Sequence, residues 1–178
     1  MYDWFVDNLR INGMVSVGNW EYAGDVEADV YDNDQTYIGT STLYLDGVKV
    51  GDAAQFTAAL GANYDFLKNF SAGLNWRLAN NLYADINPED FGSPGSKTLE
   101  LPSFSLFDAR LGYTWRMKKS NTLGFNVNVN NLFDTIYISE SDTNQHVEAG
   151  DDTWEGINTG NRVYFGWGRT WNFSLRFS

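Results

Sequence analysis

Residues 163–178, at the end of the sequence, read VYFGWGRTWNFSLRFS. The odd positions are apolar or aromatic except for Arg169, whereas the even positions are small, polar or charged. Because side chains alternate between the two faces of a strand, this pattern predicts one long strand over residues 163–178 between an apolar and a polar medium. About nine to eleven tilted residues cross a bilayer core, so the length favours a transmembrane strand over the edge strand of a soluble sandwich.

Five other stretches alternate in the same way, which gives about six membrane-crossing strands in three hairpins. They cover residues 9–17, 54–66, 70–84, 105–117 and 123–138, the last with a register break at 131–134. Short turns are expected at 67–69 and 118–121, and long polar loops at 22–50, 87–102 and 139–161. Transmembrane barrels have short periplasmic turns and long outer loops. The pattern therefore predicts a periplasmic C-terminus and outward-facing loops, with residues 22–50 forming an extracellular hairpin.

Composition limits the classes of protein to which the chain can belong. The 178 residues include no cysteine, which excludes a disulfide scaffold and a cysteine–zinc site. A net charge of −11 without a basic stripe excludes nucleic acid as the expected partner. The opening residues MYDWFVDN lack the apolar core of a secretory signal. For an outer-membrane protein, we therefore expect the chain to be mature or the tail of a longer one.

Catalytic, metal and cofactor sites are not expected. His146 is the only histidine and falls in a loop without a suitable serine, so an enzyme is disfavoured. Asp32, Asn33 and Asp34 lack the glycine and distal glutamate of a calcium loop, so we expect a solvated turn there.

About six strands leave two interpretations of the whole. An open sheet in lipid has unpaired amides at its edges, and the smallest membrane barrels have eight strands. The chain is therefore either a complete eight-stranded barrel, acting as an anchor, adhesin or narrow pore, or a part of a larger barrel.

Two ordered motifs favour the second interpretation. Residues 130–134 read NNLFD, with Tyr137 after them, and residues 165–171 read FGWGRTW. Together they resemble the "N-N-L-F-D…Y" and "G-x-G-R-T" segments at the C-terminal end of the β-barrel of TonB-dependent outer-membrane receptors. Supporting matches lie at residues 50–55, 83–88, 101–102 and 108–110. The family commonly has proline where this chain has Trp167, and it usually ends on an aromatic residue, whereas Ser178 follows Phe177 here.

The resemblance implies an all-β fold, an antiparallel transmembrane β-barrel segment of about six long strands from a 22-stranded type of barrel. Residues 1–178 would form one partial barrel domain without the plug domain. The family takes up large scarce nutrients, such as iron chelates, cobalamin or oligosaccharides, across the bacterial outer membrane. Implied partners are membrane lipid and lipopolysaccharide, the rest of the barrel, the plug, and the TonB complex acting through the plug. Alone, the chain is not expected to transport anything.

Two groups of candidate site residues follow. Residues expected to face the lumen, where they would wet it or contact the plug, are Gln55, Arg77, Asp108, Arg110, Asn126, Asn128, Asn172 and Arg176. The alternative role for each of these is lumen hydration without ligand contact. Ligand contacts are expected in the long loops, where the aromatic candidates are Tyr31, Tyr44, Phe91 and Trp154.

Overall fold

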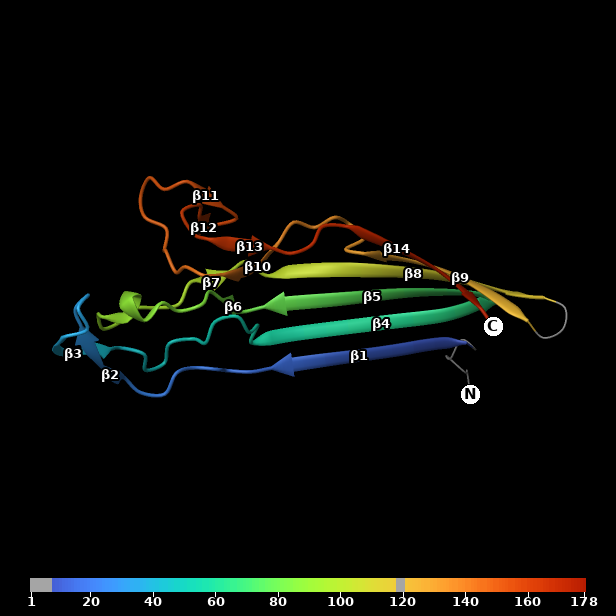
Figure 1. Ribbon diagram of the computed structural model, residues 1–178. Coiled ribbons are helices and arrows are strands. Elements are labelled where there is room, and N and C mark those ends of the chain that lie inside the picture. The colour runs from blue at the N-terminus through green and yellow to red at the C-terminus, as the bar shows by residue number, and fades with distance from the viewer. Residues whose placement is uncertain (1–7, 118–120) are drawn as a thin grey trace, which may run out of the picture.

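The computed structural model describes residues 8–117 and 121–178, and in this part of the chain the fold is all-β and antiparallel, as predicted. Six long strands form one sheet in the order β1-β4-β5-β8-β9-β14, so each strand pairs with the next long strand of the sequence (Figure 1). Their bounds are β1 (Leu9–Val17), β4 (Phe56–Leu67), β5 (Phe70–Asn80), β8 (Phe104–Arg116), β9 (Thr122–Asn130) and β14 (Thr170–Phe177). The opening residues 1–7, and residues 118–120 of the second expected turn, lie outside the described residues.

The pairing register keeps the two kinds of side chain on separate faces. One row across the sheet joins Gly13, Leu60, Trp76 and Phe107, and another joins Ala72, Leu111, Val127 and Phe173. A row on the opposite face joins Asn63, Gly73, Arg110, Asn128 and Asn172. Because a slip of one residue would exchange the faces, the register itself separates an apolar face from a polar face.

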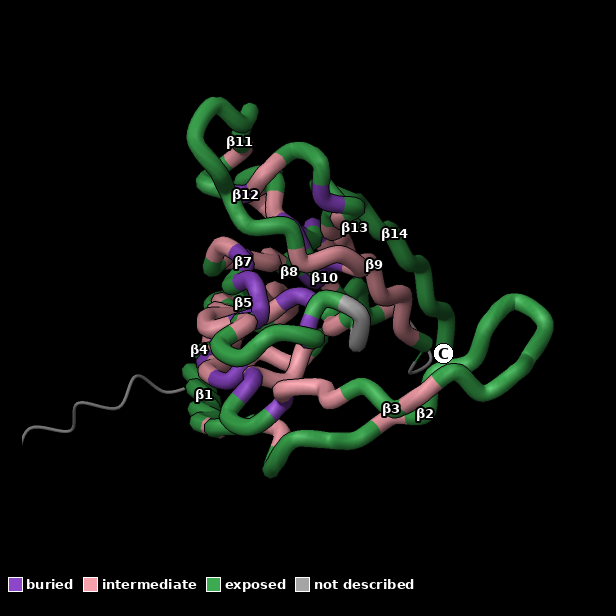
Figure 2. The backbone as a smooth tube through the Cα atoms, turned by 90° about the vertical axis from the view of Figure 1, so that its left-hand side faces the viewer, coloured by how far each residue is buried: buried purple, intermediate pink, exposed green. Residues whose placement is uncertain are grey.

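The sheet is open. Within the described residues, β1 and β14 are its outermost strands and do not pair with each other, so these residues do not form the closed eight-stranded barrel of the alternative interpretation. Every residue of β1 and β14 is exposed, and Figure 2 shows both strands in the green of exposed residues. Large apolar side chains on these strands stay uncovered, including Val15, Trp171 and Phe173 at 68%, 69% and 66% exposure.

The prediction of one continuous strand over residues 163–178 is wrong, because the structure divides this stretch into two strands. Strand β13 (Val163–Phe165) pairs with β10 (Ile138–Ser141), whereas β14 begins at Thr170 and pairs with β9. Likewise, β9 ends at Asn130 rather than near residue 138. The cause is a tight contact between residues 131–137 and 166–169, described below.

The long loops gather at one end of the sheet, whereas the C-terminus and the β4–β5 turn lie at the other end (Figure 1). The loops contain β2 (Val26–Tyr31) and β3 (Tyr37–Leu43), which form the predicted hairpin, and the 3₁₀ turn η1 (Pro88–Phe91). The short strands are β6 (Leu82–Tyr83), β7 (Glu100–Leu101), β11 (Thr153–Trp154) and β12 (Ile157–Asn158).

Two small apolar cores hold the loops together. One contains Leu82, Ala84, Leu99, Leu101, Ile138 and Ile157, and the other contains Leu45, Val48 and Phe91. Most of the buried apolar side chains therefore lie among the loops rather than on the long sheet. No helix among the described residues is long and apolar enough to cross a membrane.

Candidate functional site

Ion pairs and amide hydrogen bonds connect the strands across the polar face of the sheet. Arg77 Nη2 lies 3.0 Å from Asp108 Oδ2, which joins β5 to β8. Arg110 on β8 reaches across β5 at Gly73 and donates a hydrogen bond of 2.7 Å to Asn63 Oδ1 on β4. These contacts satisfy charged groups by pairing them on the face that would be costly to turn toward lipid.

Glycines let the amide side chains of this face lie flat on the neighbouring strand. A Cβ added at Gly61 would lie 2.7 Å from the Oδ1 atoms of both Asn12 and Asn75. A Cβ at Gly73 would lie 2.7 Å from Asn63 Oδ1. The polar face is therefore a shallow sheet of hydrogen-bonding groups rather than a deep catalytic cleft.

Most of the residues expected to face the lumen lie on this face. Arg110, Asn128 and Asn172 share one row across three strands, and Asn126 lies in the next row. Arg176 lies opposite Gly124 at the turn end. Gln55 differs from the expectation: it precedes β4, is 5% exposed, and its Nε2 donates to the Trp20 carbonyl at 2.9 Å. The Gln55 side chain therefore anchors the segment that follows β1 through the Trp20 carbonyl.

The two motif segments contact each other where β9 ends. Asn131 is 3% exposed, and its Nδ2 donates to the carbonyls of Thr135 at 2.8 Å and Trp167 at 3.2 Å. Its Oδ1 accepts from Thr135 N at 2.9 Å. Its backbone N donates to Asp108 Oδ1 at 2.9 Å, which extends the Arg77–Asp108 pair into the motif.

Further contacts explain why residues 166–169 leave the strand. Arg169 N donates to Asp134 Oδ1 at 2.7 Å, and the two side chains form an ion pair at 3.6 Å. Gly166 N donates to the Tyr137 carbonyl at 2.9 Å, and a Cβ at Gly166 would lie 1.8 Å from the Tyr137 ring. The sequence pattern does not predict this contact between the two motif segments; its one signal is Arg169, a charge on the apolar side of the alternation.

The four aromatic loop candidates do not converge. Tyr31 stacks edge-on against Tyr37 in the β2–β3 hairpin, with ring centroids 5.8 Å apart. Tyr44 N donates to the Phe91 carbonyl at 2.8 Å, so these two residues are close. Phe91 is fully buried in the second small core, so its ring is not accessible to a ligand in this structure, contrary to its selection as a ligand-contact candidate. Trp154 is half-buried and lines a separate cavity.

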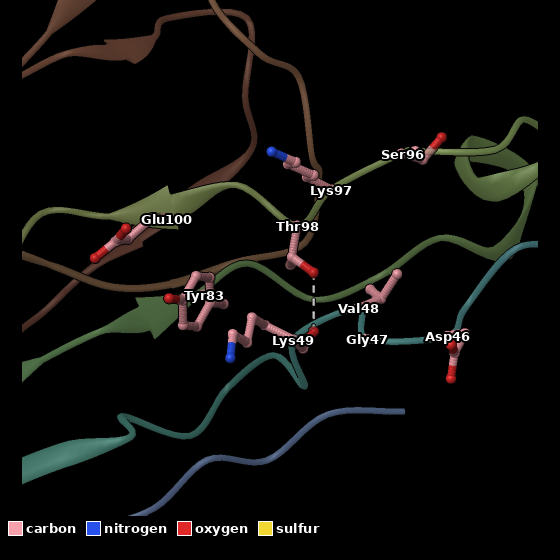
Figure 3. A pocket seen from close by; sticks show the side chains of 10 residues that line it. Asp46, Gly47, Val48, Lys49, Tyr83, Ser96, Lys97, Thr98 and Glu100 are labelled. Atoms are coloured by element: carbon pink, nitrogen blue, oxygen red, sulfur yellow. Dashed lines mark hydrogen bonds between the residues drawn. The ribbon is translucent and has the colours of Figure 1, made fainter. Parts of the chain in front are cut away.

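A cleft of about 460 Å³ lies between the loops at 46–49, 83 and 95–100 (Figure 3). Thr98 Oγ1 closes one side by donating to the Lys49 carbonyl at 2.8 Å. Lys49 Nζ pairs with Glu21 and donates to Asn19 Oδ1 at 2.6 Å. Its ammonium is thus partnered, and the hydrogen bond from Lys49 holds the pKa of Glu21 below its ordinary value.

Acidic groups meet where three loops come together. Burial raises the pKa of the Asp52 carboxyl, and the nearby carboxylates of Asp85, Glu140 and Asp142 act in the same direction. The Tyr164 hydroxyl donates to Asp142 Oδ2 at 2.8 Å, which raises the pKa of the Tyr164 phenol. The carboxylates of this cluster therefore disfavour a further anion beside Asp52.

His146 has a structural partner, because its Nε2 lies 2.9 Å from the Lys97 carbonyl. Within residues 8–117 and 121–178, no group of three or more histidine, cysteine, aspartate or glutamate side chains is arranged to hold a metal ion. The expected solvated turn at residues 32–34 is present, with Asp32 Oδ1 accepting from Asp34 N at 2.9 Å and from Thr36 N at 2.8 Å.

No protein-family model and no curated protein matches this sequence. Among solved structures, the chain is similar to the closed form of the ferric-catecholate import receptor Fiu from K12 E. coli, with 20% sequence identity and a TM-score of 0.47. The match covers 85% of this chain and 23% of the receptor, so the chain spans less than a quarter of that protein. We therefore base the functional proposal on the sheet and loops of this chain.

Proposed function

We propose that this chain is the C-terminal barrel portion of a TonB-dependent receptor that imports a large scarce nutrient across the bacterial outer membrane. The observation that carries the proposal is the open sheet with one apolar and one polar face. The apolar face suits lipid, and the polar face suits a water-filled lumen.

The free edges support a larger assembly. Strands β1 and β14 both present unpaired backbone groups along their outer sides in the described structure. Such groups cost several kcal/mol each in hydrocarbon, by the order of magnitude for an unsatisfied polar group, so further strands must cover them. The rest of the barrel and a plug on the polar face are the partners that we propose.

The arrangement of loops supports an orientation with the C-terminus in the periplasm and the long loops outside. Ligand binding then falls to the loop end, and energy comes from the TonB complex through the plug. No step of this function requires catalysis by the chain.

An uptake assay tests the proposal. A strain lacking the gene that encodes this chain is compared with its parent for uptake of radiolabelled ferric chelates, cobalamin and malto-oligosaccharides. We expect the deletion to abolish uptake of one class, and an uncoupler of the proton-motive force to abolish the same uptake in the parent. Equal uptake of all three classes by both strains, or uptake that persists with the uncoupler, would overturn the proposal.

A further inference from the structure

A cavity of about 470 Å³ opens within the loop between β10 and β13, apart from the cleft of Figure 3. Ile138 and Ile157 line it, and both are almost fully buried, at 1% and 5% exposure, in the first small core. Trp154 and Phe165 form walls, with ring centroids 5.2 Å apart and planes at 84°. The cavity thus has an apolar floor and an aromatic side where the two rings meet edge to face, and its volume is within the range of small-molecule sites.

Hydrogen bonds fix the loop around this cavity in one arrangement. Asn161 is 8% exposed, and its Oδ1 accepts from Thr143 Oγ1 at 2.9 Å and from Gln145 N at 2.8 Å. Its Nδ2 donates to the carbonyls of Gln145 at 2.8 Å and Asn158 at 3.1 Å. A site held in this way is preformed, which lowers the entropic cost of binding.

The same hydrogen bonds restrict the chemistry of the ligand. Asn158 Oδ1 accepts from Gly160 N at 2.8 Å, and its Nδ2 donates to Asp151 Oδ2 at 2.7 Å. The amides of Asn158 and Asn161 are both engaged inside the loop, and the other polar lining residues, Thr159 and Arg162, have partners in Asp152 and Asp142, so a hydroxyl-rich sugar would find few free polar partners. An apolar ring instead gains edge and face contacts with the two aromatic walls.

Charge near the cavity restricts the ligand further. The loop carries Glu140, Asp142, Glu148, Asp151, Asp152 and Glu155. Arg162 lines the cavity, and its Nε pairs with Asp142 Oδ2 at 2.9 Å, so that its positive charge is balanced by this carboxylate. The surrounding field therefore disfavours an anionic group.

We propose that this cavity binds an uncharged planar aromatic group carried by the transported nutrient. The inference rests on the proposed function and names the part of the ligand that this loop recognises. Trp154 and Phe165 would contact the ring, and the acidic loop would select against anionic analogues.

Binding of three probes tests the inference on the complete outer-membrane protein in lipid nanodiscs. The probes are 2-naphthylmethanol, which is neutral, 2-naphthoate, which has the same ring with a negative charge, and methyl α-D-glucopyranoside, which is rich in hydroxyls. We expect saturable binding of 2-naphthylmethanol, at least tenfold weaker binding of 2-naphthoate, and none of the glucoside. Glucoside binding at similar affinity, or equal affinity for the two naphthyl probes, would overturn the inference.

Two variants localise the site. Trp154→Ala should weaken 2-naphthylmethanol binding at least tenfold, whereas Trp167→Ala, a matched change of an 85% exposed tryptophan outside the cavity, should leave it unchanged. Thr159→Trp should block the cavity by replacing an exposed side chain whose hydrogen bond is to the Asp152 carbonyl at 3.2 Å, which keeps the test valid if Trp154→Ala disturbs the loop. Unchanged binding in Thr159→Trp would contradict the inference.

Heat-modifiable migration of the same samples reports whether the barrel is folded. A folded outer-membrane barrel that does not bind 2-naphthylmethanol overturns this inference alone. A protein that never enters the outer membrane overturns the proposed function.

Discussion

Replacing Asn131, which lies just after the end of β9, should be among the most damaging single changes in the motif contact. Its side chain makes three hydrogen bonds to backbone groups of Thr135 and Trp167, and the residue has a φ of 49°. At roughly 1 kcal/mol for each hydrogen bond, Asn131→Ala should lose about 3 kcal/mol of unfolding free energy. The left-handed backbone should add about 1 kcal/mol, because alanine tolerates it less well than asparagine.

A second substitution separates the two contributions. Asn131→Gly loses the same hydrogen bonds but adopts the left-handed conformation freely, so it should be about 1 kcal/mol more stable than Asn131→Ala. Asn172→Ala, a matched change on the exposed β14, should stay within about 0.5 kcal/mol of the parent.

Urea unfolding of the complete protein in detergent micelles, followed by tryptophan fluorescence, measures these differences. The reasoning fails if Asn131→Ala lies within about 0.5 kcal/mol of the parent, which is the range of ordinary surface substitutions. Equal stability of the alanine and glycine variants would refute the backbone part alone.

Three further predictions concern the faces, the motif contact and the acidic loops. Phe173→Arg should destabilise the protein by about 2–4 kcal/mol in lipid vesicles, and Ser174→Arg on the opposite face should have little effect; equal losses would contradict the face assignment. Gly166→Ala should cost about 1–3 kcal/mol, because its Cβ would lie 1.8 Å from the Tyr137 ring, whereas Gly168→Ala, with 3.2 Å to Asp134 Oδ1, should cost less; unfolding midpoints in the reverse order would refute the contact. Burial raises the pKa of Asp52, so ionising this carboxyl destabilises the folded protein; the cost is absent below the unfolded pKa of 3.8 and complete above the folded pKa. Asp52→Asn should therefore become more stable relative to the parent as the pH rises from about 3.5 to 7. A difference in melting temperature that does not change with pH would count against this prediction.

Most of the long strands were predictable because a strand with one apolar and one polar face has a period of two in its own sequence. The alternation located four of the six long strands to within four residues at each end, whereas the strands over residues 123–138 and 163–178 were predicted too long. Nothing beyond the local pattern was needed for these four, since each face keeps one kind of side chain along its length.

The division of the last strand was not predictable from alternation. Phe165, Trp167 and Trp171 keep the same phase through residues 166–169, although those residues are bound to a distant segment instead of a neighbouring strand. A contact between segments more than 25 residues apart leaves no periodic signal, apart from the charge of Arg169 on the apolar side.

The loop candidates depended on tertiary packing in the same way. Phe91 lies in a proline-containing segment that reads as an exposed loop, yet it is buried against Leu45 and Val48 from another loop. Gln55 reads as the first polar position of a strand, but its carbonyl accepts from Gly18 N at 2.7 Å and its amide group holds Trp20. Neighbouring loops decide the burial of such residues, and single-sequence patterns do not contain that information.

Cysteine labelling along β14 tests the two-faced sheet most directly, because the chain has no cysteine of its own. Single cysteines at Asn172, Phe173, Ser174 and Leu175 are labelled in intact outer membranes with a water-soluble maleimide and with a lipid-soluble one. We expect the water-soluble reagent to label positions 172 and 174, and the lipid-soluble reagent to label positions 173 and 175. Labelling of all four positions by the water-soluble reagent would contradict a sheet that separates lipid from an aqueous lumen.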